Sequence, residues 1–322
     1  MTDTSDPTTA VAATSRLFSM MPALQDELLA RYPEARIATS SKAAEDDLIE
    51  FLLGATVAVI GVERFTARVL DALPDLEVIA CCSAGVDHLD PGELEARGIR
   101  MGWIPGVNKH AVSELALCLM LDLVRHVNWA NVELRAGRWT PPKRGRLLRG
   151  ATVGVHGCGN IGREVVKLLQ PFGVEILACD RVDQPEFYAE HGVEAVEPEE
   201  LWARSEVLTI HLPRNSTTIG LYTPEVLDQL RPGVFLVNTA RGSIVDEAGV
   251  AERLADGRIA GAAFDVFHVE PVDSPELTSS ADFVGLPHMG ASAREAWLAM
   301  GRAGLRGITE NAVPSPGTYP FD

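Results

Sequence analysis

The sequence predicts an α/β fold made of two Rossmann-like, doubly wound parallel sheets. Three observations predict this fold class. Short β-branched runs alternate with helix-like segments in two series, a long segment without proline separates the series, and a glycine-rich turn opens the second one. With 322 residues, of which 46% are hydrophobic and 23% charged, the chain has the length and composition of about two soluble domains.

The first series runs from Arg16 to Trp103 and has the rhythm of a parallel sheet flanked by helices. The expected strands are 16–20, 56–61, 77–82 and 99–103, and the expected helices are 22–32, 65–73 and 91–98. Residues 1–15 are rich in Thr, Ser and Asp, so they are predicted to form a disordered tail.

Segment 106–137 lacks proline and has glycine only at its ends, which predicts a long helix or two abutting helices. A connector rich in Pro, Gly and Arg follows at 138–150. The second series then has six strand candidates separated by helices, which is typical of a nucleotide-binding sheet. The six are 151–157, 174–180, 206–213, 234–242, 260–267 and 282–287, and an amphipathic helix is expected over 292–311.

Charge and composition exclude several classes of function. A net charge of -17 argues against a general surface for nucleic acid or anionic membranes, which are bound through excess Lys and Arg. The chain has neither a run of about 20 apolar residues nor a signal-peptide pattern, so a cytoplasmic protein is expected. No His or Cys spacing matches a zinc pattern, so no metal site is predicted. The cysteines, expected to be reduced core thiols, are Cys81, Cys82, Cys118, Cys158 and Cys179.

The stretch "GVHGCGNIGREVVKLL" indicates a dinucleotide site. Gly157, Gly159 and Gly162 follow an apolar strand and open a helix, where glycines allow a tight turn and close approach of a diphosphate to the helix N-terminus. The next strand ends at Asp180, which can accept hydrogen bonds from ribose hydroxyls and repel a 2′-phosphate. NAD is therefore preferred over NADP, although the neighbouring Arg181 could help to accommodate the extra phosphate.

Polar residues follow the later strands of the second series. Arg241, Asp265, Glu270 and His288 lie at or after three of the predicted strand ends. Because ligands of open α/β sheets bind outside the carboxyl ends of the strands, these side chains are expected to converge. Two structural alternatives stay open: a half-exposed histidine at a strand end, and a weak surface ion pair between Arg241 and Glu270.

The sequence resembles the D-isomer-specific 2-hydroxyacid dehydrogenases, the family that includes short phosphoglycerate dehydrogenases and hydroxypyruvate or glyoxylate reductases. The segments that carry the resemblance are "CSAGVDHLD", "VNKHAVSELAL", "GCGNIGREV", "LPRNSTTIGLY", "VNTARGSIVDE", "AAFDVFHVEP" and "LPHMGAS". The resemblance implies an NAD-binding Rossmann domain over 104–289 inserted into a flavodoxin-like substrate domain over 1–103 and 290–322. It also implies a homodimer with a small 2-hydroxy or 2-oxo acid as substrate.

The resemblance assigns roles to individual residues. The catalytic set it implies is Arg241, Glu270 and His288. The cofactor contacts it implies are Gly157, Gly159, Asn160, Ile161, Gly162, Asp180, Arg181, Leu212, Pro213, Thr217, Thr239, Ala240, Arg241, Asp265, His288 and Gly290. The substrate contacts it implies are Ser83, Ala84, Gly85, Asn108, Arg241 and Trp139, the last one reaching the partner subunit's pocket.

The chemistry of a 2-oxo acid fits these roles independently. Hydride addition at C2 builds negative charge on the carbonyl oxygen, so the site needs a fixed cation and a proton donor. Arg241 can bind the carboxylate and the carbonyl together through its planar guanidinium. The imidazolium of His288 can donate the proton, while Glu270 stabilises that charged form and fixes the ring.

Departures from the family pattern narrow the substrate. Ala84 stands where phosphite-oxidising relatives carry lysine, and Glu270 stands where formate dehydrogenases carry glutamine, so neither phosphite nor formate is expected. Three of the connector's basic residues, Lys143, Arg144 and Arg146, either favour a substrate with a second anionic group, such as a phosphonate, or form a solvated basic loop. Two alternative functions stay open: an NAD-binding corepressor-like or regulatory module of the same fold, and a dehydrogenase of a phosphonate or other secondary-pathway 2-hydroxy acid. Core packing is expected for two atypical residues, His156 and Met289.

Overall fold

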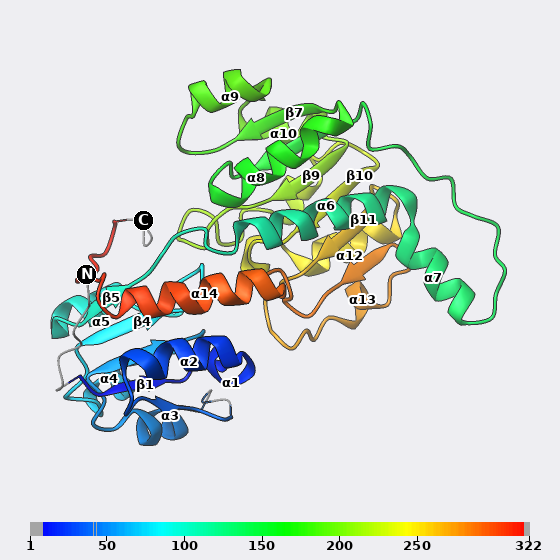
Figure 1. Cartoon of the computed structure of the whole chain (residues 1–322). Helices are drawn as coiled ribbons and strands as arrows, with labels where there is room; N and C mark the ends of the chain where they lie inside the picture. The colour runs from blue at the N-terminus through cyan, green and yellow to red at the C-terminus, as the bar shows by residue number, and fades with distance from the viewer. Residues whose placement is uncertain (1–8, 41, 43, 319–322) are drawn as a thin grey trace. The chain divides into compact units, whose positions relative to one another are not determined.

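A computed structural model describes residues 9–318 of the chain except residues 41 and 43. Backbone contacts divide the chain into two compact units. One unit consists of the chain up to Asn108 together with the chain from Ser292 onward, and the other consists of Lys109–Ala291. Each unit contains one all-parallel sheet with helices on both faces, which confirms the predicted fold class (Figure 1).

The sheet of the first unit has the strand order β2-β1-β3-β4-β5, which is the flavodoxin-like order. Its strands are β1 (Val11–Ala13), β2 (Arg36–Ile37), β3 (Val57–Ile60), β4 (Val78–Cys81) and β5 (Arg100–Gly102). Its helices are α1 (Arg16–Met20), α2 (Pro22–Arg31), α3 (Glu45–Leu52), α4 (Ala67–Asp71), α5 (Pro91–Arg97) and α14 (Arg294–Gly307). Alternate strand residues face α3, α4 and α5 on one side and α1, α2 and α14 on the other, so both faces are buried.

Helix α14 lies unusually close to this sheet. A side-chain carbon added to Gly304 would lie 2.4 Å from the sulfur of Cys82, and one added to Gly102 would lie 2.1 Å from the carbonyl oxygen of Gly307. Glycine is required at these contacts because no larger residue leaves room for the helix at that distance. The C-terminal segment is therefore an integral layer of the first unit.

Two predictions for the N-terminal region are wrong. Residues 16–20 form helix α1 and not a strand, and residues 11–13, which were expected in a disordered tail, form strand β1 between β2 and β3. The run "VAA" is too short and too alanine-rich to stand out as a strand, and it is stabilised by pairing on both sides. The part of the expected tail over 1–8 lies outside the described residues.

The second unit has the strand order β12-β11-β10-β9-β6-β7-β8, which extends the dinucleotide-binding order by one strand. Its strands are β6 (Thr152–His156), β7 (Glu175–Cys179), β8 (Val193–Ala195), β9 (Val207–Ile210), β10 (Val234–Asn238), β11 (Ile259–Phe264) and β12 (Phe283–Gly285). All six predicted strands are confirmed. The seventh, β8, is a three-residue edge strand that the sequence analysis did not identify.

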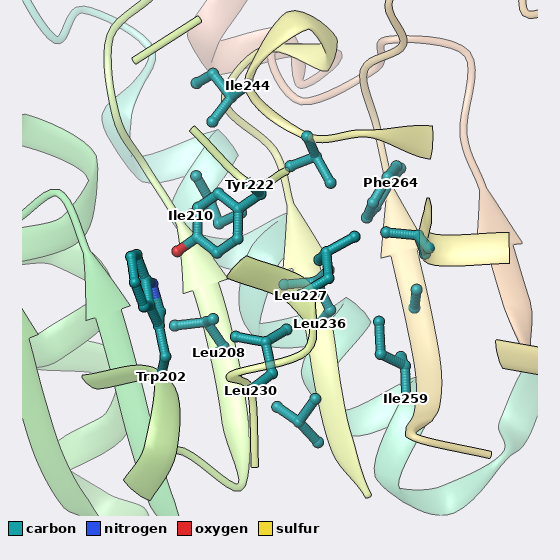
Figure 2. Close-up of a cluster of buried hydrophobic side chains, with 14 of the residues drawn as sticks. Trp202, Leu208, Ile210, Tyr222, Leu227, Leu230, Leu236, Ile244, Ile259 and Phe264 are labelled. Carbon is teal, nitrogen blue, oxygen red and sulfur yellow. The ribbon is translucent and has the colours of Figure 1, made fainter. Parts of the chain in front are cut away.

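Helices cover both faces of this second sheet. The helices of this unit are α6 (Lys109–Arg125), α7 (Val127–Arg135), α8 (Asn160–Leu169), α9 (Pro185–His191), α10 (Pro198–Arg204), α11 (Pro224–Leu227), α12 (Glu247–Ala255) and α13 (Pro275–Thr278), with short 3₁₀ turns at Gln170–Phe172 and Gly242–Ile244. All of them except α7 cover the sheet. Helices α6, α8 and α9 pack on one face. Helices α10 to α13 pack on the other, where Trp202, Tyr222 and Phe264 lie among aliphatic side chains (Figure 2).

Segment 106–137 forms two abutting helices, one of the two predicted forms. His126 separates α6 from α7 in a left-handed backbone conformation with φ of 54°, and the carboxylate of Asp122 accepts a hydrogen bond of 2.6 Å from the backbone N–H of Asn128. Helix α7 contains no buried residue. Figure 1 shows α7 and the connector after it extending beyond the helices that cover the second sheet.

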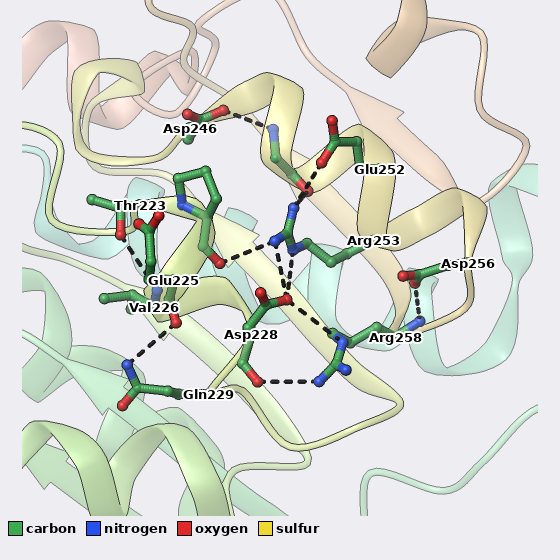
Figure 3. A network of polar contacts seen from close by, with 12 residues as sticks. Thr223, Glu225, Val226, Asp228, Gln229, Asp246, Glu252, Arg253, Asp256 and Arg258 are labelled. Atoms are coloured by element: carbon green, nitrogen blue, oxygen red, sulfur yellow. Dashed lines mark hydrogen bonds and ion pairs between the residues drawn. The ribbon is translucent and has the colours of Figure 1, made fainter.

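A buried arginine fixes helix α12 (Figure 3). Arg253, 8% exposed, donates to the carboxylate of Asp228 and to the carbonyl oxygens of Pro224 and Gly249. Asp246 caps the start of the helix by accepting a hydrogen bond of 2.7 Å from the N–H of Gly249. Because a buried guanidinium is stable only with such partners, these contacts hold α12 against α11 and the residue that follows it, Asp228.

Three expectations about individual side chains can be compared with the structure. His156 packs in the core as expected: it is 5% exposed, and its Nδ1 lies 2.6 Å from the hydroxyl of Tyr222. Burial lowers the pKa of His156 to about 4. The expectation is wrong for Met289, which is 39% exposed at the end of the second sheet, and for Cys118, which is exposed on α6.

Candidate active site

The glycine-rich turn joins β6 to α8. A side-chain carbon on Gly162 would lie 2.1 Å from the carbonyl oxygen of Gly157, whereas one on Gly159 would meet nothing within 4 Å. The turn is therefore tight on its protein side and open on the side where a ligand can approach. Gly159 gives the helix no side-chain cap, so the first N–H groups of α8, at Asn160 and Ile161, are available to an anion.

Asp180 lies directly after β7 and is tied to the same turn. One carboxylate oxygen accepts a hydrogen bond of 2.5 Å from the N–H of Cys158, and the other accepts one of 3.0 Å from the N–H of Val182. Gln184 adds a bond of 2.7 Å to the carbonyl oxygen of Cys158. A partly exposed carboxylate beside the glycine turn can accept hydrogen bonds from ribose hydroxyls. The neighbouring Arg181 is exposed.

The other expected cofactor contacts lie at the carboxyl ends of the same parallel strands. Leu212, Pro213 and Thr217 follow β9, Thr239 and Ala240 follow β10, Asp265 follows β11, and Gly290 follows β12. Within the described part of the chain, the buried hydroxyl of Thr239 has no hydrogen-bond partner. An unpaired polar group at this edge, together with the open glycine turn, fits a bound dinucleotide.

Glu270 and His288 form the central pair of the site. The Nδ1 atom of His288 lies 2.8 Å from one carboxylate oxygen of Glu270, and the other oxygen accepts a hydrogen bond of 3.0 Å from the N–H of Phe267. The side chains of His288 and Glu270 are 51% and 38% exposed, so the pair is accessible to a small molecule. With Nδ1 held by a carboxylate, the ring can exchange a proton through Nε2.

His288 has a left-handed backbone conformation with φ of 53°, which is uncommon for a residue other than glycine. Asp265, 1% exposed, supports it by accepting hydrogen bonds of 2.7 and 2.8 Å from the N–H groups of Met289 and Gly290. Its carbonyl oxygen also accepts the N–H of His288 at 2.9 Å. Burial raises the pKa of Asp265, and the two N–H groups counteract the shift. Sequence spacing gave no signal of this supporting role.

Arg241 projects from a turn that the fully buried side chain of Asn238 organises. The Asn238 amide accepts from the N–H of Ala240 and donates to the carbonyl oxygen of Arg241, both at 3.0 Å. The next residue, Gly242, lies directly against the backbone of Phe267, since a side-chain carbon there would be 1.9 Å from the Phe267 carbonyl carbon. The turn of Arg241 thus contacts the loop that carries Glu270.

The residues expected to bind substrate are divided between the units. Ser83, Ala84 and Gly85 follow β4, and Asn108 precedes α6, so these four belong to the first unit. The hydroxyl of Ser83 and the Asn108 side-chain oxygen are buried without a hydrogen-bond partner among the described residues. Trp139 is 91% exposed on the connector of the second unit.

Of the three connector cations considered for substrate binding, Lys143 and Arg146 are already paired with carboxylates. Lys143 lies 2.5 Å from Asp282, just before β12, and over the ring of Trp129. Arg146 pairs with Glu206, just before β9. Both pairs lie at the amino ends of the strands, opposite the edge that carries His288. This placement argues against the hypothesis that Lys143 and Arg146 bind a second anionic group of a substrate held in the same unit.

Two kinds of site are absent from residues 9–318, apart from 41 and 43. No group of three His, Cys, Asp or Glu side chains there could ligate a metal ion. Over the same residues, none of the helices has the length and apolar character needed to cross a bilayer.

The doubly wound sheet, the open glycine turn and the strand-end His–Glu pair define a dinucleotide-dependent oxidoreductase. Residues 117–290 match the family model described as "D-isomer specific 2-hydroxyacid dehydrogenase, NAD binding domain". The chain therefore belongs to the D-isomer-specific 2-hydroxyacid dehydrogenase family. It is an oxidoreductase that acts on a CH–OH group with NAD as cofactor.

Individual relatives support this assignment. The chain is 34% identical over 268 residues to a hydroxypyruvate reductase of Thermotoga maritima, covering 82% of this chain and 87% of that protein. It is 37% identical over 231 residues to a D-3-phosphoglycerate dehydrogenase of Mycobacterium bovis, covering 71% of this chain but only 44% of that protein. The crystal structure of a glyoxylate reductase from Paecilomyes thermophila superimposes with a TM-score of 0.84 at 25% identity, over 94% of this chain and 95% of that one.

Proposed function

We propose that the protein interconverts a D-2-hydroxy acid and a 2-oxo acid, using His288 and Glu270 as an acid–base pair and Arg241 to bind the substrate. The observation that carries this proposal is the 2.8 Å contact between His288 and Glu270 at the carboxyl edge of the dinucleotide-binding sheet. When bound, NADH supplies the hydride that C2 of the oxo acid accepts. The open turn around Gly159, with Asp180 beside it, would hold this cofactor.

The residues of the chain supply the rest of the chemistry. The Arg241 guanidinium binds the substrate carboxylate and polarises the carbonyl oxygen, which orients C2 and stabilises the charge that develops there. The protonated His288 donates from Nε2 to that oxygen, while Glu270 accepts the Nδ1–H and stabilises the imidazolium. In the oxidative direction, neutral His288 takes the hydroxyl proton. We further propose that Ser83, Ala84, Gly85 and Asn108 contribute to substrate binding.

An activity screen with a histidine variant tests the proposal. We expect oxidation of NADH, and slower oxidation of NADPH, with members of a panel of pyruvate, glyoxylate, hydroxypyruvate and branched, aromatic or phosphonate-bearing 2-oxo acids. His288→Ala should lower kcat at least about a hundredfold with NADH binding retained, because general acid catalysis contributes about 10²–10⁴. His268→Ala, which changes an exposed histidine near Glu270, is the matched control.

Three outcomes of this screen would contradict parts of the proposal. A loss of tenfold or less in His288→Ala would mean that another group donates the proton. An inactive panel with intact NADH binding would favour a corepressor-like or regulatory module. Equal use of NADPH would remove the discrimination assigned to Asp180.

We also propose that the protein is a homodimer joined through the arm formed by α7 and the connector over 136–150. The arm exposes large apolar side chains, with Leu134 59%, Trp139 91% and Leu147 68% exposed. Exposed apolar surface of this kind marks association sites. In such a dimer Trp139 would reach the partner subunit's substrate pocket.

A further inference from the structure

The loop between β11 and α13 carries Glu270, and it depends on hydrogen bonds to keep its shape. Phe267 is buried at the base of the loop, but residues 268–273 are exposed and have little packing of their own. Within the loop, Phe267 donates its N–H to Glu270. The following N–H, of His268, donates to the carboxylate of Glu247 at 2.6 Å. Glu247, which is not part of the loop, therefore fixes the loop backbone at His268.

Glu247 acts from a rigid support. It is the first residue of α12, whose start is capped by Asp246 and whose body is held by the buried Arg253 (Figure 3). The peptide group that Glu247 binds, Phe267–His268, is the same one that lies against Gly242: a side-chain carbon on Gly242 would be 2.3 Å from the nitrogen of His268. This peptide is clamped between the turn of Arg241 and the start of α12.

We infer that Glu247 is a positioning residue for the reaction, because its contact with the Phe267–His268 peptide holds Glu270 at the distance from which Glu270 reaches His288. The inference rests on the proposed function of the His288–Glu270 pair. Without the acceptor at Glu247, the backbone of the exposed part of the loop loses its hydrogen bond to α12, and we expect Glu270 to leave the position in which it lies 2.8 Å from His288.

The charged groups around the pair come from several elements. Glu270 faces His288 directly, and Asp265, after β11, interacts electrostatically with both. Arg241 projects from the turn after β10. Behind the loop, Asp246, Glu247, His268, Asp273 and Glu276 line an open cavity of about 460 Å³. The loss of a negative charge could by itself affect His288. A variant of Glu247 must therefore be compared with a variant that lacks another carboxylate of this cavity.

Three variants separate hydrogen bonding from charge. Glu247→Ala removes the acceptor, Glu247→Gln removes the charge but keeps an acceptor oxygen, and Glu276→Ala removes a carboxylate of the same cavity. For 2-oxo acid reduction at saturating NADH, we expect kcat of Glu247→Ala to fall roughly tenfold, because a small misplacement of a catalytic group lowers the rate. The KM for NADH should stay at the wild-type value. Glu247→Gln should remain within about twofold of wild type, as should Glu276→Ala. Equal losses in Glu247→Ala and Glu247→Gln would overturn the inference.

A double variant tests whether Glu247 acts through Glu270. In the Glu270→Gln background the further change Glu247→Ala should lower kcat by less than about twofold, because the group being positioned has already lost its charge. A full tenfold loss in that background would show that Glu247 acts by another route.

A readout independent of turnover keeps this inference separate from the proposed function. In protein labelled with ¹³C-histidine, the ring signal of His288 can be assigned by its absence in His288→Ala and compared among variants at one fixed pH. We expect its chemical shift to change in Glu247→Ala, because Glu270 leaves the ring, and to stay at the wild-type position in Glu247→Gln and Glu276→Ala. An unchanged chemical shift in Glu247→Ala would overturn the inference, whereas inactivity of the wild-type protein would overturn the proposed function alone.

Discussion

Two acidic residues with different surroundings control His288. The exposed Glu270 contacts its ring, and the buried Asp265 fixes the backbone on which it stands. Only Glu270 contacts the imidazole ring, which is the part of His288 that can gain or lose a proton. The two carboxylates therefore have separate tasks, one electrostatic and one conformational.

Replacement of Glu270 tests the electrostatic task. Glu270→Gln keeps a polar side chain of the same size but removes the charge that stabilises the imidazolium, so the rate of 2-oxo acid reduction should fall off at lower pH than in wild type. Steady-state kcat between pH 5 and 9 measures this shift. Asp273→Asn, a carboxylate of the same loop, should keep the wild-type profile. A profile of Glu270→Gln that superimposes on wild type would remove Glu270 from its role.

A second residue-scale prediction concerns stability. Burial lowers the pKa of His156 to about 4, so between pH 4 and 6.5 the unfolded histidine takes up a proton that the folded one does not. The unfolded state then binds more protons, and stability falls as pH decreases through this range, by about 2 kcal/mol at pH 5 for this group. Denaturant unfolding of wild type and His156→Gln at pH 7 and 5 measures the difference. An identical pH dependence in both proteins would contradict the prediction.

The sequence shows the side chains proposed to react better than the residues that support them. Arg241, Glu270 and His288 could be identified because charged residues follow apolar strands, and the structure brings Glu270 and His288 into contact. The supports, Asp265 through its backbone contacts and Glu247, could not, because a side chain that binds a distant backbone N–H leaves no periodicity in the sequence.

At the scale of elements, the turn between β6 and α8 can be tested with two glycine variants. Gly162→Ala would place a carbon 2.1 Å from the Gly157 carbonyl, so the helix must shift, and both NADH affinity and stability should decrease, the latter by about 2 kcal/mol. Gly159→Ala meets no protein atom within 4 Å, so it should fold normally and lose at least tenfold in NADH affinity. Fluorescence titration and thermal unfolding measure both effects. Wild-type NADH affinity in Gly159→Ala would place the diphosphate elsewhere.

Strands were predictable where the apolar run was long and flanked by turns, as in β6, β9 and β10. Predictions for short segments were wrong in two ways: a helix was predicted as a strand, and a strand was missed. Residues 16–20 fit a strand or a helix equally well over five positions, and tertiary packing of Phe18 decides for the helix. Strand β8 has mostly exposed residues at a sheet edge, so its composition is that of a loop.

At the scale of the whole molecule, the exposed arm makes the oligomeric state testable. The variant Leu134→Lys with Leu147→Lys replaces two exposed apolar side chains of the arm by charged ones and should convert the proposed dimer into monomers, because charged groups resist burial. Sedimentation velocity at micromolar concentration measures the mass. Val62→Lys, an equally exposed apolar position in the first unit, is the control. A wild-type monomer, or a dimer unaffected by the double change, would contradict the proposal.

The position of α14 has a consequence for how the chain matures during synthesis. Strands β1 to β5 leave the ribosome before all of Lys109–Ala291, and α14, which completes the cover that α1 and α2 provide on one side of their sheet, is translated only afterwards. The inserted unit is continuous, so it can reach its native state while the earlier strands still expose Val59, Ala80 and Cys82 to water. We therefore expect Lys109–Ala291 to fold first during synthesis. The sheet of the first unit, although it is translated earlier, should be the last part to be protected from solvent.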